Sequence, residues 1–260
     1  MAKTAKENKI LKSGLKTLLH AFCACLFLIV VWIVAQEMIG NPLLLPDLFD
    51  CVKETGDILA LGGFWKGFFS TLARVFSAFG ISFVFALFFA FIAYLLPSFG
   101  AFFAPLISFL RALPTLAVLL VLLIWSGAAK APVIVAFLSL FPLLYTAILS
   151  ALQQTDEELI QMSKVYQVPL RRQILQLYLP SSAPYVCRES GAALGFSVKL
   201  VVSAEVLAST YQSLGGMMQE AKLYAEMPRL FALIGISFVT GMLLELFGVA
   251  LSALLQRRRK

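Results

Sequence analysis

The chain has 260 residues, of which 60% are hydrophobic and 13% are charged, whereas soluble domains carry about 25% charged residues. Its mean hydropathy is +0.90, and the apolar residues come in runs of about 20, the length that crosses a hydrocarbon core. This composition excludes an ordinary soluble domain and predicts a chain that lies in a lipid bilayer. The formal net charge of +7 does not indicate a nucleic-acid partner, because the basic residues gather at the termini and in one loop.

The chain begins with a lysine-rich segment that is followed by an apolar run. Basic residues followed by apolar ones are also the order of a secretory signal peptide. The run continues to Ile39 without a small-x-small cleavage site, so we predict a retained signal anchor. We therefore expect a cytoplasmic segment at 1–19. Residues 20–65 are expected to hold a transmembrane helix at 20–40 and then an external loop rich in Pro, Gly and acidic residues.

Five further apolar segments predict membrane-spanning helices. Their approximate bounds are 66–95, 107–126, 131–151, 185–208 and 229–254. Four prolines and glycines over 97–114 predict a short interfacial helix that leads into a kinked span. The predicted fold class is therefore an all-α membrane protein with about six transmembrane helices, counted from runs of about 20 apolar residues.

Basic residues gather in three places: the first 19 residues, the loop over 152–190 and the end of the chain. The positive-inside rule places all three in the cytoplasm, and an even number of crossings puts both termini on one side. Lys130 is the exception, because it falls in a short turn on the outer side. We predict a multi-pass protein of the cell inner (plasma) membrane with both termini cytoplasmic and a basic cytoplasmic tail at 256–260.

The cytoplasmic loop over 153–182 is the long polar segment of the membrane portion. Thr155 followed by Glu158 is a capping-box pattern, and an apolar stripe follows at helical spacing. The residues of the stripe are Leu159, Met162, Val165 and Tyr166. Pro169 is expected to end this helix, and a second one is predicted over 170–178. The amphipathic pattern alone fits a solvated hairpin between two spans as well as a docking segment.

This loop resembles the cytoplasmic loop of binding-protein-dependent ABC permeases. Their pattern is Glu-Ala-Ala, three residues, Gly, nine residues, Ile, one residue, Leu-Pro. Leu179-Pro180 matches the final pair, which puts Leu177 at the Ile position, Gln167 at the Gly position and residues 161–163 at the Glu-Ala-Ala positions. Glutamine enters a left-handed turn only at some cost, which leaves the shape of the turn open.

Short motifs elsewhere occur in the order and spacing of the nitrate, sulfonate and taurine permease subfamily. They are Thr71-Leu72-x-Arg74, Leu110-Arg111-x-Leu113-Pro114, Trp125-Ser126-Gly127, Phe141-Pro142, Ala204-Glu205 and Ser213-Leu214-Gly215. The resemblance implies that residues 66–255 form a permease core with the helix bundle of a type I ABC importer. It implies a membrane-spanning importer subunit for a small solute, and 153–182 would be its coupling loop. The subfamily carries sulfonate-, nitrate- or taurine-like anions and relatives carry vitamin precursors, so the solute itself stays open.

In that family the loop helix, here 156–168, docks into a groove on a separate ATPase. The residues to which the resemblance gives this role are Asp156, Glu157, Glu158, Leu159, Met162, Ser163, Val165, Tyr166, Gln167, Leu179 and Pro180. The implied partners are a cytoplasmic ABC ATPase dimer, a second permease copy in a homodimer, and an extracytoplasmic substrate-binding protein that meets outward loops such as 213–227. Because the chain lacks a G-x-x-x-x-G-K-[ST] motif, ATP belongs to the partner, and we predict no cofactor here.

Three ionisable residues fall inside predicted spans, where charges are costly and usually face a bundle interior or a cavity. Lys199, Glu205 and Glu245 are therefore candidates for the translocation pathway, although charge pairing or snorkelling explains Lys199 equally well. Arg74 and Arg111 are expected to snorkel to head groups from span ends. A separate G-x-x-x-G pattern, which begins at Gly191, permits close helix approach within the chain or between two copies.

A secondary transporter and an enzyme are the two alternatives to the importer interpretation. A stand-alone ion-coupled secondary transporter also suits six spans with a few buried charges, but such transporters often show internal repeats, and none is visible here. An enzyme is not predicted, because the chain has neither H-E-x-x-H nor G-x-S-x-G. The four cysteines fall singly or in apolar segments, so no metal site or disulfide framework is predicted from them.

Overall fold

The computed structural model describes residues 20, 23–24 and 26–257, and in these residues it contains helices and no strand. The all-α prediction is confirmed. The predicted cytoplasmic segment 1–19 and residues 258–260 of the predicted tail lie outside the described residues.

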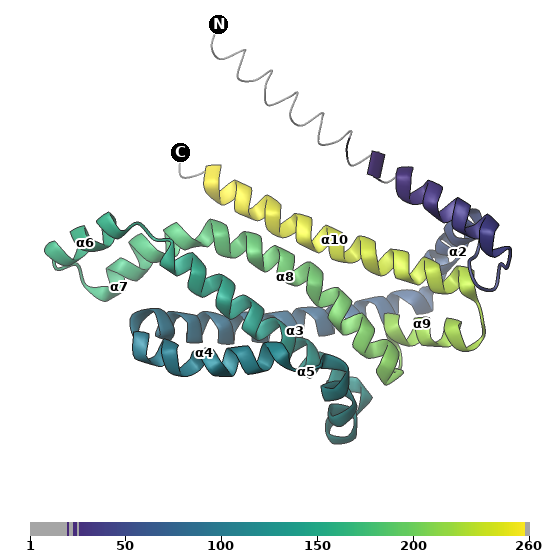
Figure 1. Cartoon of the computed structure of the whole chain (residues 1–260), viewed down its shortest axis with the longest axis horizontal. Helices are drawn as coiled ribbons and strands as arrows, with labels where there is room; N and C mark the ends of the chain where they lie inside the picture. Colours follow the sequence, from purple (N-terminus) through teal and green to yellow (C-terminus); the bar gives the residue numbers. More distant parts are fainter. Residues whose placement is uncertain (1–19, 21–22, 25, 258–260) are drawn as a thin grey trace, which may run out of the picture.

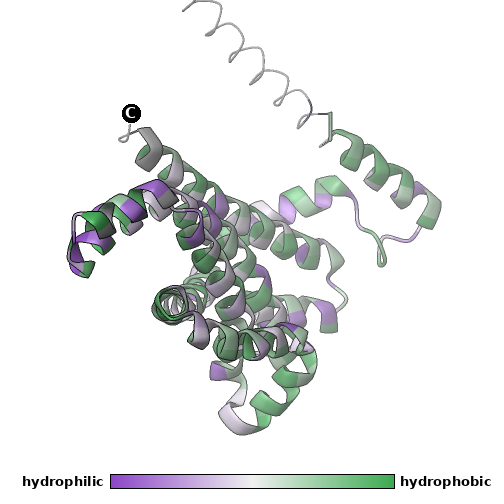
Figure 2. Ribbon diagram, turned by 60° about the vertical axis from the view of Figure 1, so that its left-hand side comes forward, coloured by the Kyte–Doolittle hydropathy of each residue, from purple (hydrophilic) through white to green (hydrophobic). Residues whose placement is uncertain are grey.

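Four long helices form the body of the protein and shorter ones lie at its two ends (Figure 1). In chain order the elements are an apolar helix over Leu26–Ile39, α2 (Leu48–Ala60), α3 (Gly62–Leu95), α4 (Pro97–Ala112), α5 (Thr115–Gln153), α6 (Glu157–Val165), α7 (Leu170–Gln173), the π-helix η1 (Ile174–Tyr178), α8 (Leu179–Ala208), α9 (Leu214–Leu223) and α10 (Met227–Arg257). One end of the bundle carries α6, α7 and the end of α10, while α2 and α9 lie at the other. Hydrophobic residues run along the long helices (Figure 2).

By length and composition, four of the described helices can cross a membrane. They are Gly62–Leu95, Thr115–Gln153, Leu170–Ala208 and Met227–Leu254. Leu26–Ile39 is a shorter apolar helix, and residues 21, 22 and 25 of the predicted first span are not described. The span predicted at 107–126 is not one helix, because it falls on the end of α4 and the start of α5.

Two backbone features divide the region that was predicted as two separate spans. Leu113 and Pro114 are extended between α4 and α5, as expected because a residue before proline avoids the helical region. Gly127 then interrupts α5 with φ 74° and ψ 168°, a conformation that is essentially open to glycine alone. The interfacial helix predicted over 97–114 corresponds to α4, which begins at Pro97.

The predicted external loop is not a loop throughout, because it contains the 13-residue helix α2. Asp47 is its N-cap and accepts a hydrogen bond of 3.1 Å from the backbone N–H of Phe49. Trp32, from the preceding apolar helix, donates its indole N–H to the Pro46 carbonyl at 3.3 Å and packs edge-on against Phe231 of α10. These contacts place the first apolar helix and α2 against the start of α10.

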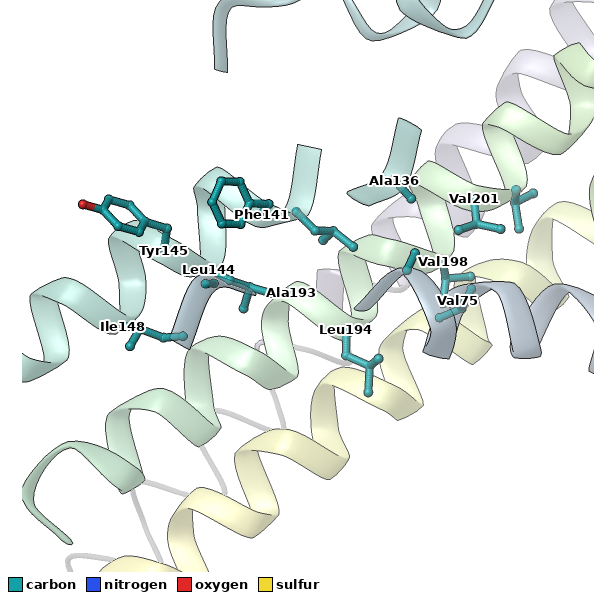
Figure 3. Packing of buried hydrophobic residues seen from close by; sticks show 14 of the residues in the cluster. Val75, Ala136, Phe141, Leu144, Tyr145, Ile148, Ala193, Leu194, Val198 and Val201 are labelled. Atoms are coloured by element: carbon teal, nitrogen blue, oxygen red, sulfur yellow. The ribbon is translucent and has the colours of Figure 1, made fainter. Parts of the chain in front are cut away.

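The core lies between α3, α5 and α8 (Figure 3). On α3 the buried face consists mainly of small residues: Ala78, Ser82, Ala86, Ala90 and Ala93. Small side chains allow two helix backbones to approach closely, and the Ser82 hydroxyl reaches the Phe137 carbonyl of α5 at 3.5 Å. Larger side chains of α5 and α8 fill the space beyond, as Figure 3 shows for Phe141, Leu144 and Val198.

Glycines bring α8 and α10 together. A Cβ added at Gly191 would lie 2.6 Å from the Gly248 Cα, and one added at Gly195 would lie 2.8 Å from the Gly241 carbonyl oxygen. The G-x-x-x-G pattern therefore serves packing within the chain, against a second pair of glycines on α10. The sequence alone allowed two roles for this pattern, packing within the chain and contact between two copies of it.

Candidate functional site

Helix α6 projects from one end of the bundle (Figure 1). Its start differs from the predicted capping box: the backbone N–H of Glu158 donates to the Asp156 Oδ1 at 3.0 Å. Thr155, predicted as the cap, is buried, and its hydroxyl lies 3.4 Å from that of Ser181 in α8. Because Thr155 is held at the base of the loop, the next residue, Asp156, caps the helix. Glu158 is exposed, and the side chain of Glu157 lies outside the described part of the chain.

The predicted apolar stripe of α6 points away from the protein. Leu159 is 46% exposed, Met162 54%, Val165 78% and Tyr166 74%. On the other side of the helix, Ile160 is partly buried against the main core. The structure therefore holds α6 by one side and presents four apolar side chains on the other, an arrangement that costs free energy in water unless a partner covers them.

A left-handed turn ends α6. Gln167 has φ 48°, and the backbone N–H of Val168 donates to the Ser163 carbonyl at 2.9 Å, the six-to-one bond of a Schellman motif. Ser163 is partly buried, and its hydroxyl donates to the Ile160 carbonyl at 2.7 Å. Glutamine at the glycine position of the family pattern therefore keeps the left-handed geometry of the turn.

Replacing Gln167 by glycine is expected to strengthen this turn by about 1 kcal/mol, since a left-handed residue with a Cβ is strained by about that amount. Hydrogen exchange at the Val168 amide measures the effect, and its protection should rise about fivefold. Gln167→Val is the opposite variant: a β-branched residue enters this region poorly, so protection should fall. Equal protection in all three proteins would contradict the left-handed assignment.

The second half of the loop is continuous with the membrane helix that follows. Helices α7, η1 and α8 form one helical segment over Leu170–Ala208. The prediction that Leu179 and Pro180 separate the loop helix from the span is therefore wrong. The π-turn accommodates the proline, because Leu179 N–H donates to the carbonyl of Ile174, five residues back. Leu179 is half exposed and Pro180 is partly buried. A movement of α6 and α7 would thus be transmitted directly to α8, because α7 and α8 belong to one helical segment.

Glu205 lies inside the protein and is paired. Its Oε1 lies 2.8 Å from Arg74 Nη1, while its Oε2 accepts from the Thr71 hydroxyl at 2.8 Å and from the backbone N–H of Gly215 at 3.2 Å. The prediction that Arg74 snorkels to head groups is therefore wrong, because Arg74 pairs with Glu205. The pairing joins α3, α8 and the start of α9, and the side chain of Glu205 is fully buried away from any large cavity.

The structure brings the other two candidates together. Lys199 of α8 and Glu245 of α10 line one cavity of about 760 Å³, although they form no ion pair within 4.0 Å. Lys199 Nζ lies 5.9 Å from the ring centroid of Phe196. Arg111, expected to reach head groups, instead lines a second cavity beside Lys199.

No metal centre accompanies these charges. In the part of the chain that the structure describes, no group of three or more His, Cys, Asp or Glu residues could hold a metal ion. What the described residues offer is an exposed apolar helix at one end of a membrane bundle and charged cavities in its middle. Such a bundle can bind a partner at its end and a small solute within.

Comparisons with known proteins agree on one family. Residues 82–260 match the family described as binding-protein-dependent transport system inner membrane component. A probable ABC transporter permease protein of Brucella melitensis is 28% identical over 78% of this chain and 81% of its own length. The taurine transport system permease protein of Escherichia coli is 24% identical over 84% of this chain and 82% of its own length.

Solved structures show the same fold at low sequence identity. An inward-facing methionine ABC transporter superposes with a TM-score of 0.63 at 14% identity, over 74% of this chain and 96% of that one. An amino acid ABC transporter superposes with a TM-score of 0.60 at 18% identity, over 82% of this chain and 98% of that one. These neighbours confirm the all-helical permease fold expected from the sequence.

Proposed function

The chain belongs to the family of binding-protein-dependent transport system inner membrane components, and we propose that it is moved by a separate ATPase that binds the exposed stripe of α6. As a member of this family it is a multi-pass permease subunit of the inner membrane and not an enzyme. Members of the family import solutes with an ATPase and a substrate-binding protein. For this chain the ATPase is an ABC ATPase dimer, which binds the ATP.

The observation that carries this proposal is the exposure of Leu159, Met162, Val165 and Tyr166 on one side of α6. An amphipathic helix that lays such a stripe into a hydrophobic groove is a common mode of recognition between proteins. The polar residues Asp156 and Glu158 are exposed beside it and suit the rim of the contact. Gln167 forms the turn that ends the helix, and Leu179 and Pro180 belong to the helical segment that continues into the membrane.

The direction of the chain in the membrane follows from the two ends of the bundle. The end with α6 also carries Arg171, Arg172 and the C-terminal end of α10, and the other end carries the acidic helix α2. The positive-inside rule supports a cytoplasmic position for the first end, and in our proposal both termini lie on that side. The segment 213–227, which includes α9, then faces outward and receives the substrate-binding protein.

A second copy of the chain completes the permease in our proposal. A single chain of this family supplies half of a translocation pathway, so two copies and two ATPases form the importer. Support comes from the cavities beside Lys199, which are open at the surface of one chain, where a second copy can close them. Of the three intramembrane candidates, Lys199 and Glu245 are assigned to the pathway, and Glu205 to structure.

Changing both Met162 and Tyr166 to Asp is expected to abolish association with the ATPase, because each carboxylate would have to enter an apolar groove without a partner. The measurement is co-purification of the ATPase subunit with the full chain in mild detergent. Retention of the ATPase by this variant would contradict the assignment of α6.

Tyr224→Asp serves as the matched control, since Tyr224 is 72% exposed, close to the 74% of Tyr166, but lies at the α9 end. This variant should keep the ATPase at the wild-type level. Uptake by vesicles that contain an ion gradient but no ATP would favour an ion-coupled secondary transporter instead and would overturn the proposed function as a whole.

A further inference from the structure

Two positively charged side chains, both exposed in the single chain, line one cavity that is open at its surface. The cavity of about 500 Å³ is bounded by the end of α4, both halves of α5 and α8, and it is lined by Arg111 and Lys199. Its lining contains no Asp or Glu. Neither cation forms an ion pair with any residue that the structure describes. Uncompensated positive charge therefore gathers at this place.

Lys199 lies well inside its membrane helix, far from the end of that helix. Lys199 precedes the end of α8 at Ala208 by nine residues, which is about 14 Å along a helix and close to half of a hydrocarbon core of about 30 Å. Ser139, which lines the same cavity, is near the middle of the second half of α5. A lysine at this depth is retained in proteins for a partner or a function.

The start of α5 adds favourable groups to the same cavity. Thr115, the first residue of α5, lines it, and the N-cap Pro114 provides no side-chain cap for the first backbone N–H groups. The positive end of the helix thus lies at the wall of this cavity, where it can favour an anionic group, as the interrupted helices of transporters do. The hydroxyls of Thr115 and Ser203 make no hydrogen bond to any residue in the described part of the chain, and they remain available as donors.

The rest of the wall is apolar. Leu116, Leu143, Phe196 and Leu200 line the cavity between the charged groups. A strongly hydrated inorganic ion would lose water to such a wall without replacement, whereas an apolar body would gain by burial. The wall therefore selects a ligand that combines one anionic group with an apolar remainder.

We propose that Arg111 and Lys199, together with the start of α5, form a binding site inside the membrane for a small organic anion with an apolar body, such as an aryl sulfonate or an aryl carboxylate. That this anion is the transported solute rests on the proposed import function; the binding site itself does not. Arg111 also lines a cavity of about 520 Å³ that reaches Pro97 and Gln153 at the α6 end. Arg111 thus lies between the proposed anion site and the cavity that opens toward the proposed cytoplasmic end of the bundle.

Glu245 is the rival partner of Lys199. It lines the cavity on the other face of Lys199, and a rearrangement of side chains would allow the two to pair. If pairing were the role of Lys199, loss of Glu245 and loss of Lys199 would have similar effects, and Arg111 would be irrelevant to both. If an anion is the partner, Lys199 and Arg111 act together, and loss of Glu245 leaves binding unchanged or stronger.

The test is calorimetric titration of the full chain in lipid nanodiscs with benzenesulfonate, and with the neutral benzenesulfonamide and inorganic sulfate as comparisons. We expect saturable binding of benzenesulfonate and at least about tenfold weaker binding of the other two, since a charge-assisted hydrogen bond and apolar contact are both required. Lys199→Met and Arg111→Met should each weaken benzenesulfonate binding by about tenfold or more. Lys199→Arg keeps the charge and should restore binding to within about threefold of wild type.

Lys222→Met, which changes an exposed lysine of α9, is the control and should bind like the wild type, whereas Glu245→Gln removes the rival partner of Lys199 and should bind at least as tightly as the wild type. Absence of benzenesulfonate binding, equal binding of benzenesulfonamide, or unchanged binding by Lys199→Met and Arg111→Met would overturn the proposal. So would a loss in Glu245→Gln equal to that in Lys199→Met. Co-purification of the ATPase with each variant shows that it is folded and tests the import function separately, because anion binding in nanodiscs needs no ATPase.

Discussion

Replacing Arg74 by methionine is expected to lower the free energy of unfolding by about 3–5 kcal/mol, because it leaves Glu205 charged and buried without its partner. Arg74 Nη1 lies 2.8 Å from Glu205 Oε1, and the side chain of Glu205 has no exposed surface. The hydrogen bonds from Thr71 and from Gly215 N–H remain in the variant, but neither brings a positive charge. An unfolding titration in mixed micelles, followed by circular dichroism, measures the change.

A second ion pair of the chain supplies the control. Arg229 lies 3.2 Å from Glu226, and both side chains are substantially exposed, so Arg229→Met should cost at most about 1 kcal/mol. Replacing Arg74 by Met together with Glu205 by Leu should recover much of the loss, since an apolar pair removes the buried charge. A stability of Arg74→Met close to that of Arg229→Met would show that the Glu205 network does not hold the bundle together.

The network also explains why α9 starts where it does. Leu214 N–H donates to the Thr71 hydroxyl at 2.9 Å, next to the bond from Gly215 N–H to Glu205, so two of the free N–H groups at the start of α9 are satisfied by side chains of other helices. A Cβ added at Gly215 would lie 2.4 Å from the Cβ of Glu205. Only glycine permits this approach, and the segment 213–227, which we propose faces outward, is thereby fixed to the membrane helices.

Hydrophobicity predicted the long helices well, because membrane spanning requires a continuous apolar run. The span expected at 66–95 is α3 over Gly62–Leu95, and the one expected at 229–254 falls within α10. Helix α2 was missed because its flanking prolines and glycines are typical of loops, although Asp47 was available as an N-cap. Its acidic residues reflect exposure on one side and do not exclude a helix.

The site was predictable where local periodicity decides it and unpredictable where distant residues meet. The stripe of α6 follows from helical spacing, and its side chains are exposed, as the proposed contact with an ATPase requires. The cap at Asp156 was missed because Thr155 is drawn toward Ser181, a residue 26 positions away. The pairing of Glu205 with Arg74, 131 positions apart, and the placement of Arg111 beside Lys199 depend on the fold, and no short motif encodes them.

Replacing Gly248 by alanine is expected to lower the free energy of unfolding by about 3 kcal/mol, at the upper end of the usual cost of overpacking. A Cβ added there would lie 2.1 Å from the Cα of Gly191 and 2.8 Å from its N. The neighbouring atoms are backbone and cannot swing aside as a flexible side chain would, so α8 and α10 must separate. The same unfolding titration in micelles measures the loss.

Gly235→Ala on the same helix isolates the packing effect, because an added Cβ at Gly235 meets nothing within 4 Å. This variant should be neutral or more stable by about 0.5–1 kcal/mol, since alanine is the better helix former. If Gly248→Ala were as stable as Gly235→Ala, then α8 and α10 would not pack through their glycines. Separation of these helices would also widen the cavity that contains Lys199 and Glu245, so Gly248→Ala is expected to weaken transport as well as folding.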